Sequence, residues 1–216
     1  MRQIEWGSFD PQGPVAAAMA ELWWLMLALG VAVFVVFAVL LGVGLFRRRA
    51  AGEQPDGPSR AGFSRWLVVG GVVVPLFIIL VVFVATIRAM RSVPTNAPPD
   101  AMVVEVTGHQ WRWEVHYPQQ GISSTNELHL PVGRPVALRL TSADVIHSFW
   151  VPQLGGKMDL LPDGVNTLVL QADEPGTHRS QCAEFCGLRH ADMKLTVVAE
   201  PAEQFESWVA DLEGTR

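Results

Sequence analysis

Two long stretches without a charged residue constrain the fold of this chain more than any other feature of its sequence. One runs from Leu22 to Phe46 and the other from Trp66 to Ile87. Each exceeds the roughly 20 apolar residues that an α-helix needs to cross the hydrocarbon core of a membrane. Buried core helices are the alternative, but two such runs so close together favour two membrane spans. Pro75, inside the second run, is tolerated in a membrane helix and can kink it.

The segment between the two runs, residues 47–65, is basic and rich in Gly and Pro. Its charged residues are Arg47, Arg48, Arg49, Arg60 and Arg65, against Glu53 and Asp56. The positive-inside rule therefore predicts that this loop is cytoplasmic. Both ends of the chain then lie outside, and the rest of the protein faces the periplasmic or outer side of a bacterial plasma membrane.

Charge changes sign along the chain. Residues 1–99 hold eight basic and five acidic residues, a net of +3, whereas residues 100–216 hold eight basic and sixteen acidic residues, a net of −8; together they give −5. The two parts are therefore expected to lie in different environments. The acidic part would repel phosphate, so nucleic acid is not expected among its partners.

After the proline-rich segment 92–100, the pattern changes to short, β-branched, alternating runs that Gly and Pro separate. Such runs with regular turns predict an all-β sandwich or barrel. The runs are Met102–Thr107, Gln110–Tyr117, Glu127–Leu130, Pro135–Thr141, Val145–Val151, Val165–Gln171 and Lys194–Val198. Beyond them, Phe205, Trp208, Val209 and Leu212 have the spacing of an amphipathic helix.

The expected fold is thus a two-helix transmembrane hairpin followed by a β-sandwich. Its parts are an external segment (1–21), a first span (22–46), a cytoplasmic loop (47–65), a second span (66–87), a linker (88–100), a β-domain (101–200), and a C-terminal helix and tail (201–216).

Two segments of the β-domain carry metal-binding side chains. One reads Asp144-Val-Ile-His147-Ser-Phe-Trp150; the other holds Cys182, Cys186, His190 and Met193 at successive spacings of four, four and three residues. Thiolate, imidazole and thioether together favour copper over calcium, magnesium or manganese. A disulfide between the only two cysteines is the ordinary alternative in an exported domain. The His and Met at fixed offsets make that pairing improbable in the functional form.

The number of sulfur ligands indicates which metal site fits. Zinc is satisfied by two Cys and two His and has no use for Met193. A single blue copper uses one Cys, so the second would be surplus. Two cysteines make sense if they bridge two copper ions, each with one terminal histidine and one weak ligand. Met193 suits one ion as the weak ligand, and the backbone carbonyl of Glu184 suits the other.

These residues resemble the dinuclear copper domain of cytochrome c oxidase subunit II, whose domain is cupredoxin-like. The resemblance rests on His147-Ser-Phe-Trp-x-Pro, Lys157-Met-Asp159, the Cys182-to-Met193 motif and the aromatic segment Gly108-His-Gln-Trp-Arg-Trp113. Two spans followed by such a domain match the family over nearly the whole chain. The copper motif is specific, whereas the spans alone would be a weak signal.

The resemblance also implies roles for individual residues. The copper ligands would be His147, Cys182, the carbonyl oxygen of Glu184, Cys186, His190 and Met193. The Glu184 side chain would bind magnesium at the junction with subunit I. Electrons from cytochrome c would enter at Trp111, and Asp159 would be an acidic docking position. Residues Trp66 to Pro75 contain no carboxylate, so no residue is assigned to proton uptake.

The function implied is that of the electron-transfer subunit of a proton-translocating cytochrome c oxidase. It would take electrons from a c-type cytochrome and pass them to haem in subunit I, where oxygen is reduced to water; the other oxidase subunits would be further partners. A nitric oxide reductase of the haem–copper superfamily is the alternative with the same copper module. Quinol oxidase subunits resemble the fold but lack the copper ligands, all of which are present here. A membrane-anchored copper chaperone would need exposed, exchangeable ligands.

Overall fold

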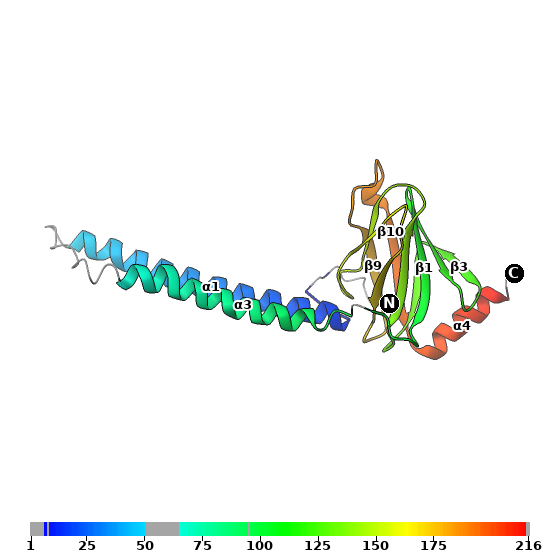
Figure 1. The fold of residues 1–216 in the computed structure, drawn as a ribbon, viewed down its shortest axis with the longest axis horizontal. Helices are drawn as coiled ribbons and strands as arrows, with labels where there is room; N and C mark the ends of the chain where they lie inside the picture. Colours follow the sequence, from blue (N-terminus) through cyan, green and yellow to red (C-terminus); the bar gives the residue numbers. More distant parts are fainter. Residues whose placement is uncertain (1–6, 8, 51–64, 95, 215–216) are drawn as a thin grey trace. The chain divides into compact units, whose positions relative to one another are not determined.

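The computed structural model describes residues 7, 9–50, 65–94 and 96–214. They form two compact units, one comprising residues 21–91 and the other residues 1–20 and 92–216. The first is a pair of helices and the second contains two β-sheets (Figure 1). The predicted fold class, two apolar helices followed by a β-sandwich, is confirmed.

The helices are α1 (Pro14–Ala50) and α3 (Val74–Met90), and the π-helical turn η1 (Val69–Val73) precedes α3. The helical stretches Pro14–Arg47 and Arg65–Met90 are long and apolar enough to cross a membrane, and no residue in the most apolar window of each is buried. Core helices of a soluble protein would instead be buried. Most of the loop expected at 47–65 lies outside the described residues, and α1 continues beyond the expected end of the first span, to Ala50.

The irregular turn η1 ends at Val73, two residues before Pro75. The N–H of Val74 donates to the carbonyl of Val69, five residues back, instead of four as in an α-helix. Pro75 has no N–H, so the carbonyl four residues before it loses its usual partner. The disturbance expected from this proline is therefore present as one wide turn.

The β-unit contains two five-stranded sheets. One has the strand order β3-β2-β1-β5-β8 and the other β4-β10-β9-β6-β7. The strands are β1 (Met102–His109), β2 (Arg112–Tyr117), β3 (Ile122–Thr125), β4 (Glu127–Pro131), β5 (Val136–Ser142), β6 (His147–Trp150), β7 (Met158–Leu160), β8 (Asn166–Leu170), β9 (Gly176–Cys182) and β10 (Lys194–Glu200). Most neighbours are antiparallel, but β1 pairs with β5 and β10 with β4 in parallel.

The core between the sheets follows from the alternation of side chains along each strand. Val104 and Val106 of β1 are fully buried, as are their parallel partners Leu138 and Leu140 of β5. Trp113 of β2 is also fully buried, and its ring meets Phe149 of the opposite sheet edge to face, with centroids 5.6 Å apart. This packing places the first residue of β6 and the last residue of β9 at one end of a rigid scaffold.

Helix α4 (Ala202–Glu213) packs against the core through one apolar face. Phe205 is buried, and Trp208 stacks flat on His129 with ring centroids 3.9 Å apart. Tyr117 accepts a hydrogen bond from the backbone N–H of His129 at 2.7 Å and lies edge-on to Trp208. The helix lies within the range 201–216 expected for the C-terminal helix and tail.

The segment that precedes α1 belongs to the β-unit. The N–H of Gln12 donates to the carbonyl of Gln153 at 2.8 Å, and its carbonyl accepts from the N–H of Asp173 at 2.8 Å. A Cβ atom at Gly13 would lie 2.3 Å from the carbonyl oxygen of Gln171, so only glycine fits there. Val15, two residues further on, is buried.

Three strands were not expected from the sequence: β3, β7 and β9. Strand β9 matters most because it ends in Cys182. Its sequence, Gly-Thr-His-Arg-Ser-Gln-Cys, has no hydrophobic alternation, yet His178, Ser180 and Cys182 all point to the buried side. The tertiary context therefore decides this strand, because its own residues are mostly polar.

Candidate metal centre

The two segments singled out in the sequence meet at one end of the β-unit. His147 is the first residue of β6 and Cys182 the last residue of β9, and these strands are antiparallel neighbours with Phe149 opposite Cys182. The chain then loops through Cys186 and the 3₁₀ turn η2 (His190–Asp192) before Met193 leads into β10. Pairing of β9 with β10 therefore brings both ends of the loop together.

The side chains of this loop converge with His147. The two thiol sulfurs, of Cys182 and Cys186, lie 3.8 Å apart. Cys182 Sγ is 3.9 Å from Nδ1 of His147 and 3.2 Å from the carbonyl oxygen of Glu184. Cys186 Sγ is 3.6 Å from Nδ1 of His190 and 3.7 Å from Sδ of Met193. Atoms that bind one metal ion at about 2.0–2.3 Å lie about 3–4 Å from one another, so these separations suit metal coordination.

The donors fall into two groups, one around each thiol. Cys182 has His147 and the Glu184 carbonyl beside it, whereas Cys186 has His190 and Met193. Each group offers one imidazole and one weak donor, and the neighbouring thiols join the two. A single tetrahedral ion would need four of these atoms around one point. Two metal ions that shared both thiols could each take one of these groups.

Burial protects this cluster from water. His147 and Met193 are fully buried, and both cysteines are buried and free of any disulfide. The Glu184 side chain is exposed, although its carbonyl faces the thiols. His190 is half-buried beneath the ring of Phe185, at a centroid distance of 5.8 Å.

Asp144 fixes the orientation of His147. The Nε2–H of His147 donates to Oδ1 of Asp144 at 2.8 Å, which leaves Nδ1 directed at Cys182. Oδ1 also accepts from the N–H of Val145, and Oδ2 accepts from the N–H of Gln110. Metal-binding histidines commonly present their second nitrogen to a carboxylate in this way.

Gly108 leaves room for the same imidazole. A Cβ atom at this position of β1 would lie 2.8 Å from Cδ2 and 3.1 Å from Cγ of His147. Approaches below 3 Å force a side chain to move, and the ring of His147 is packed on every side. Glycine is therefore required here by the position of the His147 ring on the opposite sheet.

The thiols differ in acidity. Burial by itself would raise the pKa of Cys182, but hydrogen bonds with His147 and with the backbone at Ser148 and Glu184 outweigh it and lower the pKa to about 6. Burial, together with the charge on Cys182, raises the pKa of Cys186 to about 12. The Cys182 thiol therefore ionises readily, whereas burial and the charge on Cys182 oppose ionisation of the Cys186 thiol. Bound cations would remove that restraint.

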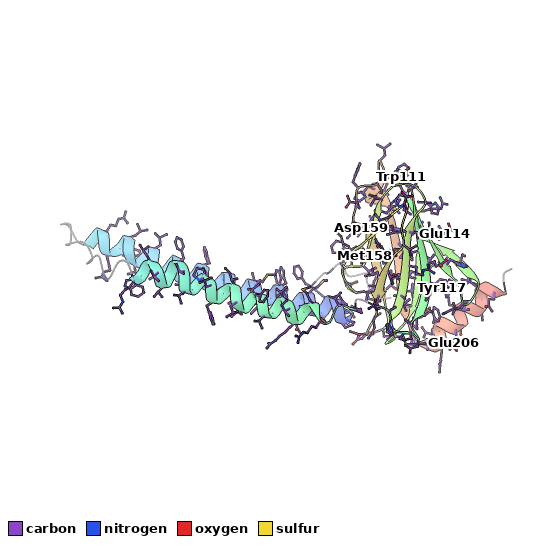
Figure 2. All side chains as sticks on the ribbon, in the orientation of Figure 1. Trp111, Glu114, Tyr117, Met158, Asp159 and Glu206 are labelled. Carbon is purple, nitrogen blue, oxygen red and sulfur yellow. The ribbon has the colours of Figure 1, made fainter. Side chains whose placement is uncertain are left out.

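The two other predicted site residues lie near the cluster but outside it. Trp111 follows β1 and packs beside Gly187, the residue after Cys186. Asp159 lies on β7 opposite Ser148, half-exposed, with Oδ1 3.5 Å from Nζ of Lys157. Figure 2 labels both residues on the β-unit. The structure thus brings the six predicted ligand groups together and leaves Asp159 on a neighbouring strand, paired with a cation.

Three residues at the centre were not assigned from the sequence: Gly108, Gln110 and Asp144. All three stand inside the quoted motifs, within three positions of a residue that was assigned. Their roles depend on contacts between strands that are distant in the chain. Among the described residues, the cluster of His147, Cys182 and Cys186 is the one group of three or more His, Cys, Asp or Glu able to hold a metal ion.

Comparison with known proteins places the chain among oxidase subunits. A family model described as cytochrome c oxidase subunit II, periplasmic domain, matches residues 119–200. Cytochrome c oxidase subunit 2 of Alkalihalophilus pseudofirmus is 31% identical over 211 residues, which are 94% of this chain and 60% of that protein. Quinol oxidase subunit 2 of Bacillus cereus is 32% identical over 212 residues, 95% of this chain and 72% of that protein.

A solved structure is similar in the β-unit. It is the periplasmic domain of subunit II of cytochrome oxidase (CoxB) of Bradyrhizobium japonicum, with a TM-score of 0.53 and 29% identity. The match covers 56% of this chain and 99% of that one. The chain spans less than two thirds of the Alkalihalophilus relative, so sequence shared with that protein does not extend over its full length.

Proposed function

This chain belongs to the cytochrome c oxidase subunit II family, and on that premise we propose that it is the electron-accepting subunit of a membrane-bound haem–copper oxidase. In this role it takes electrons one at a time from a c-type cytochrome. It passes each to haem in subunit I, where oxygen is reduced to water. The complex is an oxidoreductase, and the oxygen chemistry lies outside this chain.

The observation that carries the proposal is the division of the donors into two groups around neighbouring thiols. A pair of copper ions bridged by two thiolates shares one electron over both metals and exchanges it with little change of geometry. The donor set of two thiols, two imidazoles and one thioether has the softness that copper prefers. Neither a zinc site nor a single blue copper would use all of these donors.

The residues of the chain have separate tasks in this proposal. Cys182 and Cys186 would hold both ions, and His147 and His190 would each hold one of them. Met193 and the Glu184 carbonyl would be the weak ligands. The fixed sheet ends hold His147 and Cys182, and the buried thiols and Met193 keep water away. A rigid, dry site suits electron transfer because little has to rearrange when charge arrives.

The quinol oxidase relatives suggest a second function, in which a similar subunit serves an enzyme oxidising quinol. The resemblance noted from the sequence implies that such subunits lack the copper ligands. Here all six ligand groups are present and converge. The copper-bearing function is therefore favoured.

Two apolar helices and a family defined by a periplasmic domain indicate a membrane-anchored protein with its β-unit outside the cytoplasm. We further propose that the membrane is a bacterial plasma membrane. Trp111 is the point at which electrons enter, Asp159 contributes to docking of the donor, and the exposed Glu184 carboxylate binds magnesium at the junction with subunit I.

Electron paramagnetic resonance tests the copper site directly. The full chain, purified in detergent and loaded with copper, should bind two copper ions and give a spectrum in which one unpaired electron is shared equally by two copper nuclei. A spectrum of one isolated cupric ion would contradict the proposal. Rapid loss of copper to a mild chelator would favour a chaperone. Reduction of nitric oxide by the isolated complex, with no oxygen reduction, would move the chain to the nitric oxide reductases.

A further inference from the structure

The indole of Trp111 has no polar anchor of its own within the described part of the chain. Its Nε1 is buried and has no hydrogen-bond partner there. The ring packs against the edge of the core and beside Gly187. A Cβ atom at Gly187 would lie 3.3 Å from Cζ2 and 3.4 Å from Nε1 of the indole. The position of the ring must therefore be set by its neighbours.

The preceding residue, Gln110, is anchored at two points. Its side-chain Nε2 donates to the carbonyl oxygen of Cys186 at 2.7 Å. Its backbone N–H donates to Oδ2 of Asp144, also at 2.7 Å. Gln110 and Trp111 form the short turn between β1 and β2. The position of one residue of this turn therefore largely decides the position of the other.

Gly187 shows how closely this turn approaches the metal-binding loop. Its φ is +118°, a conformation that residues with a side chain rarely adopt. A Cβ atom there would also lie 3.1 Å from Nε2 of Gln110. The amide of Gln110 and the indole of Trp111 thus both lie in the space that a side chain at position 187 would fill, directly beside Cys186.

We propose that Gln110 is a positioning residue for electron uptake: its side-chain amide ties the turn to the Cys186 carbonyl and so holds the indole of Trp111 against the metal-binding loop. This inference rests on the proposed function, because it assumes that electrons enter at Trp111. In that step the donor's ferrous haem is oxidised to ferric and gives up one electron to the copper pair, with no bond broken and no proton moved.

The side-chain hydrogen bond can be tested apart from the backbone one. A change at position 110 leaves the N–H that binds Asp144 in place. Gln110→Glu keeps the shape of the side chain but sets an acceptor against the Cys186 carbonyl. Gln110→Met keeps the length and removes both polar atoms. Gln119→Glu, at an exposed position in the turn between β2 and β3, is the matched control for the added charge.

The first measurement needs neither copper nor a donor. The full chain is labelled with 5-fluorotryptophan and examined in detergent by ¹⁹F NMR without metal, with Trp111→Phe identifying the resonance of Trp111. Gln110→Glu and Gln110→Met should shift or broaden that resonance, while the other tryptophans keep theirs. Gln119→Glu should leave all of them unchanged. An unaltered Trp111 resonance in both variants at position 110 would overturn the proposal that the Gln110 side chain positions the indole.

The second measurement separates electron transfer from binding. The copper-loaded chain is mixed with a saturating, reduced, basic c-type cytochrome in a stopped-flow instrument. Losing one hydrogen bond shifts the equilibrium between the held and the released indole by about fivefold. Transfer in the bound complex should therefore slow by up to about fivefold. The dissociation constant and the copper spectrum should not change. Unchanged transfer would refute Gln110 as a positioning residue, whereas failure of the unaltered chain to accept electrons would refute the proposed function instead.

Discussion

Oδ1 of Asp144 accepts a hydrogen bond from Nε2 of His147 at 2.8 Å, and this contact decides which imidazole nitrogen faces the thiols. Because Nε2 keeps its proton for the carboxylate, Nδ1 has the lone pair that a metal needs. The same carboxylate accepts from the N–H of Gln110. One side chain therefore orients His147, a proposed metal ligand, and holds the turn that carries Trp111.

Replacing this carboxylate should weaken metal binding. The N–H groups of His147, Val145 and Gln110 now share the two carboxylate oxygens of Asp144. Asp144→Asn leaves one acceptor oxygen for these three donors. Copper affinity should therefore fall about 10–100-fold, as it does for other outer-shell partners of metal-binding histidines. Competition with a chelator of known affinity measures the loss, and Asp163→Asn, in an exposed turn, is the control. Equal affinity in both variants would mean that packing alone orients His147.

The thiols should be far less replaceable than the thioether. Cys182→Ser or Cys186→Ser should abolish the shared-electron spectrum, because each sulfur would bridge both ions in the proposed centre. Met193→Leu should keep two copper ions and change mainly the reduction potential, since a weak axial ligand tunes more than it holds. Glu184→Gln should also keep copper, because only its carbonyl faces the thiols, yet lose magnesium. Metal analysis with spectroscopy distinguishes these cases; an intact dinuclear spectrum in Cys186→Ser would contradict the bridge.

Docking and electron transfer should respond to different residues. Trp111→Ala should slow transfer within the bound complex and leave binding largely intact. Asp159→Asn should weaken binding only slightly and flatten its salt dependence, because Lys157 already offsets part of its charge. Association with a basic donor should slow as salt is added, since charges are screened beyond about 8 Å at physiological ionic strength. Rates that rise with salt would indicate an acidic donor.

Stability should decline in mild acid because of His178. Burial lowers the pKa of this imidazole below its usual 6.5, although Asp10 opposes the shift. Its Nδ1–H donates to Oε1 of Gln153 at 3.0 Å, and Nε2 is buried with no partner among the described residues. Protonation would therefore bury an unpaired N–H. The unfolded chain binds this proton more readily than the folded protein does. The contribution of neutral His178 to stability is therefore complete above pH 6.5 and is lost as pH falls from 6.5 through the folded pKa.

This dependence can be measured by thermal unfolding of the full chain in detergent, followed by near-ultraviolet circular dichroism between pH 7.5 and 5. His178→Gln should flatten the decline in midpoint temperature. His116→Gln, a change of a histidine nearer the surface, should leave it as steep as before. Parallel curves for all three proteins would assign the acid sensitivity to other groups.

The orientation of the two helices across the membrane can be tested with reporters. A reporter inserted within residues 47–65 should be cytoplasmic and one fused after Arg216 external, because the connecting segment contains five arginines. Protease added to the outside of spheroplasts should digest the β-unit. Digestion from the cytoplasmic side alone would reverse the proposed orientation.

The sequence was sufficient for the features that depend on local pattern or on residue type. The apolar runs predicted both helices, and the spacing of Cys182, Cys186, His190 and Met193 predicted which groups would converge. Strand β9 could not be predicted, because its polar residues are held by their neighbours and not by their own preference. Gly108 and Asp144 were missed for a related reason: each acts on His147 across a strand boundary, and no local signal marks such a contact.

The hydrogen bonds of Gln12 with Gln153 and Asp173 have a consequence for how the protein is made. Chain segments that share hydrogen bonds must occupy the same aqueous compartment. With α1 and α3 in a membrane, the chain between residues 13 and 92 has to leave that compartment and return to it, so the number of crossings is even. The residues before α1 and the β-unit must both be exported before these bonds can form. Insertion of the helical hairpin is therefore a step in the folding of the domain that follows it.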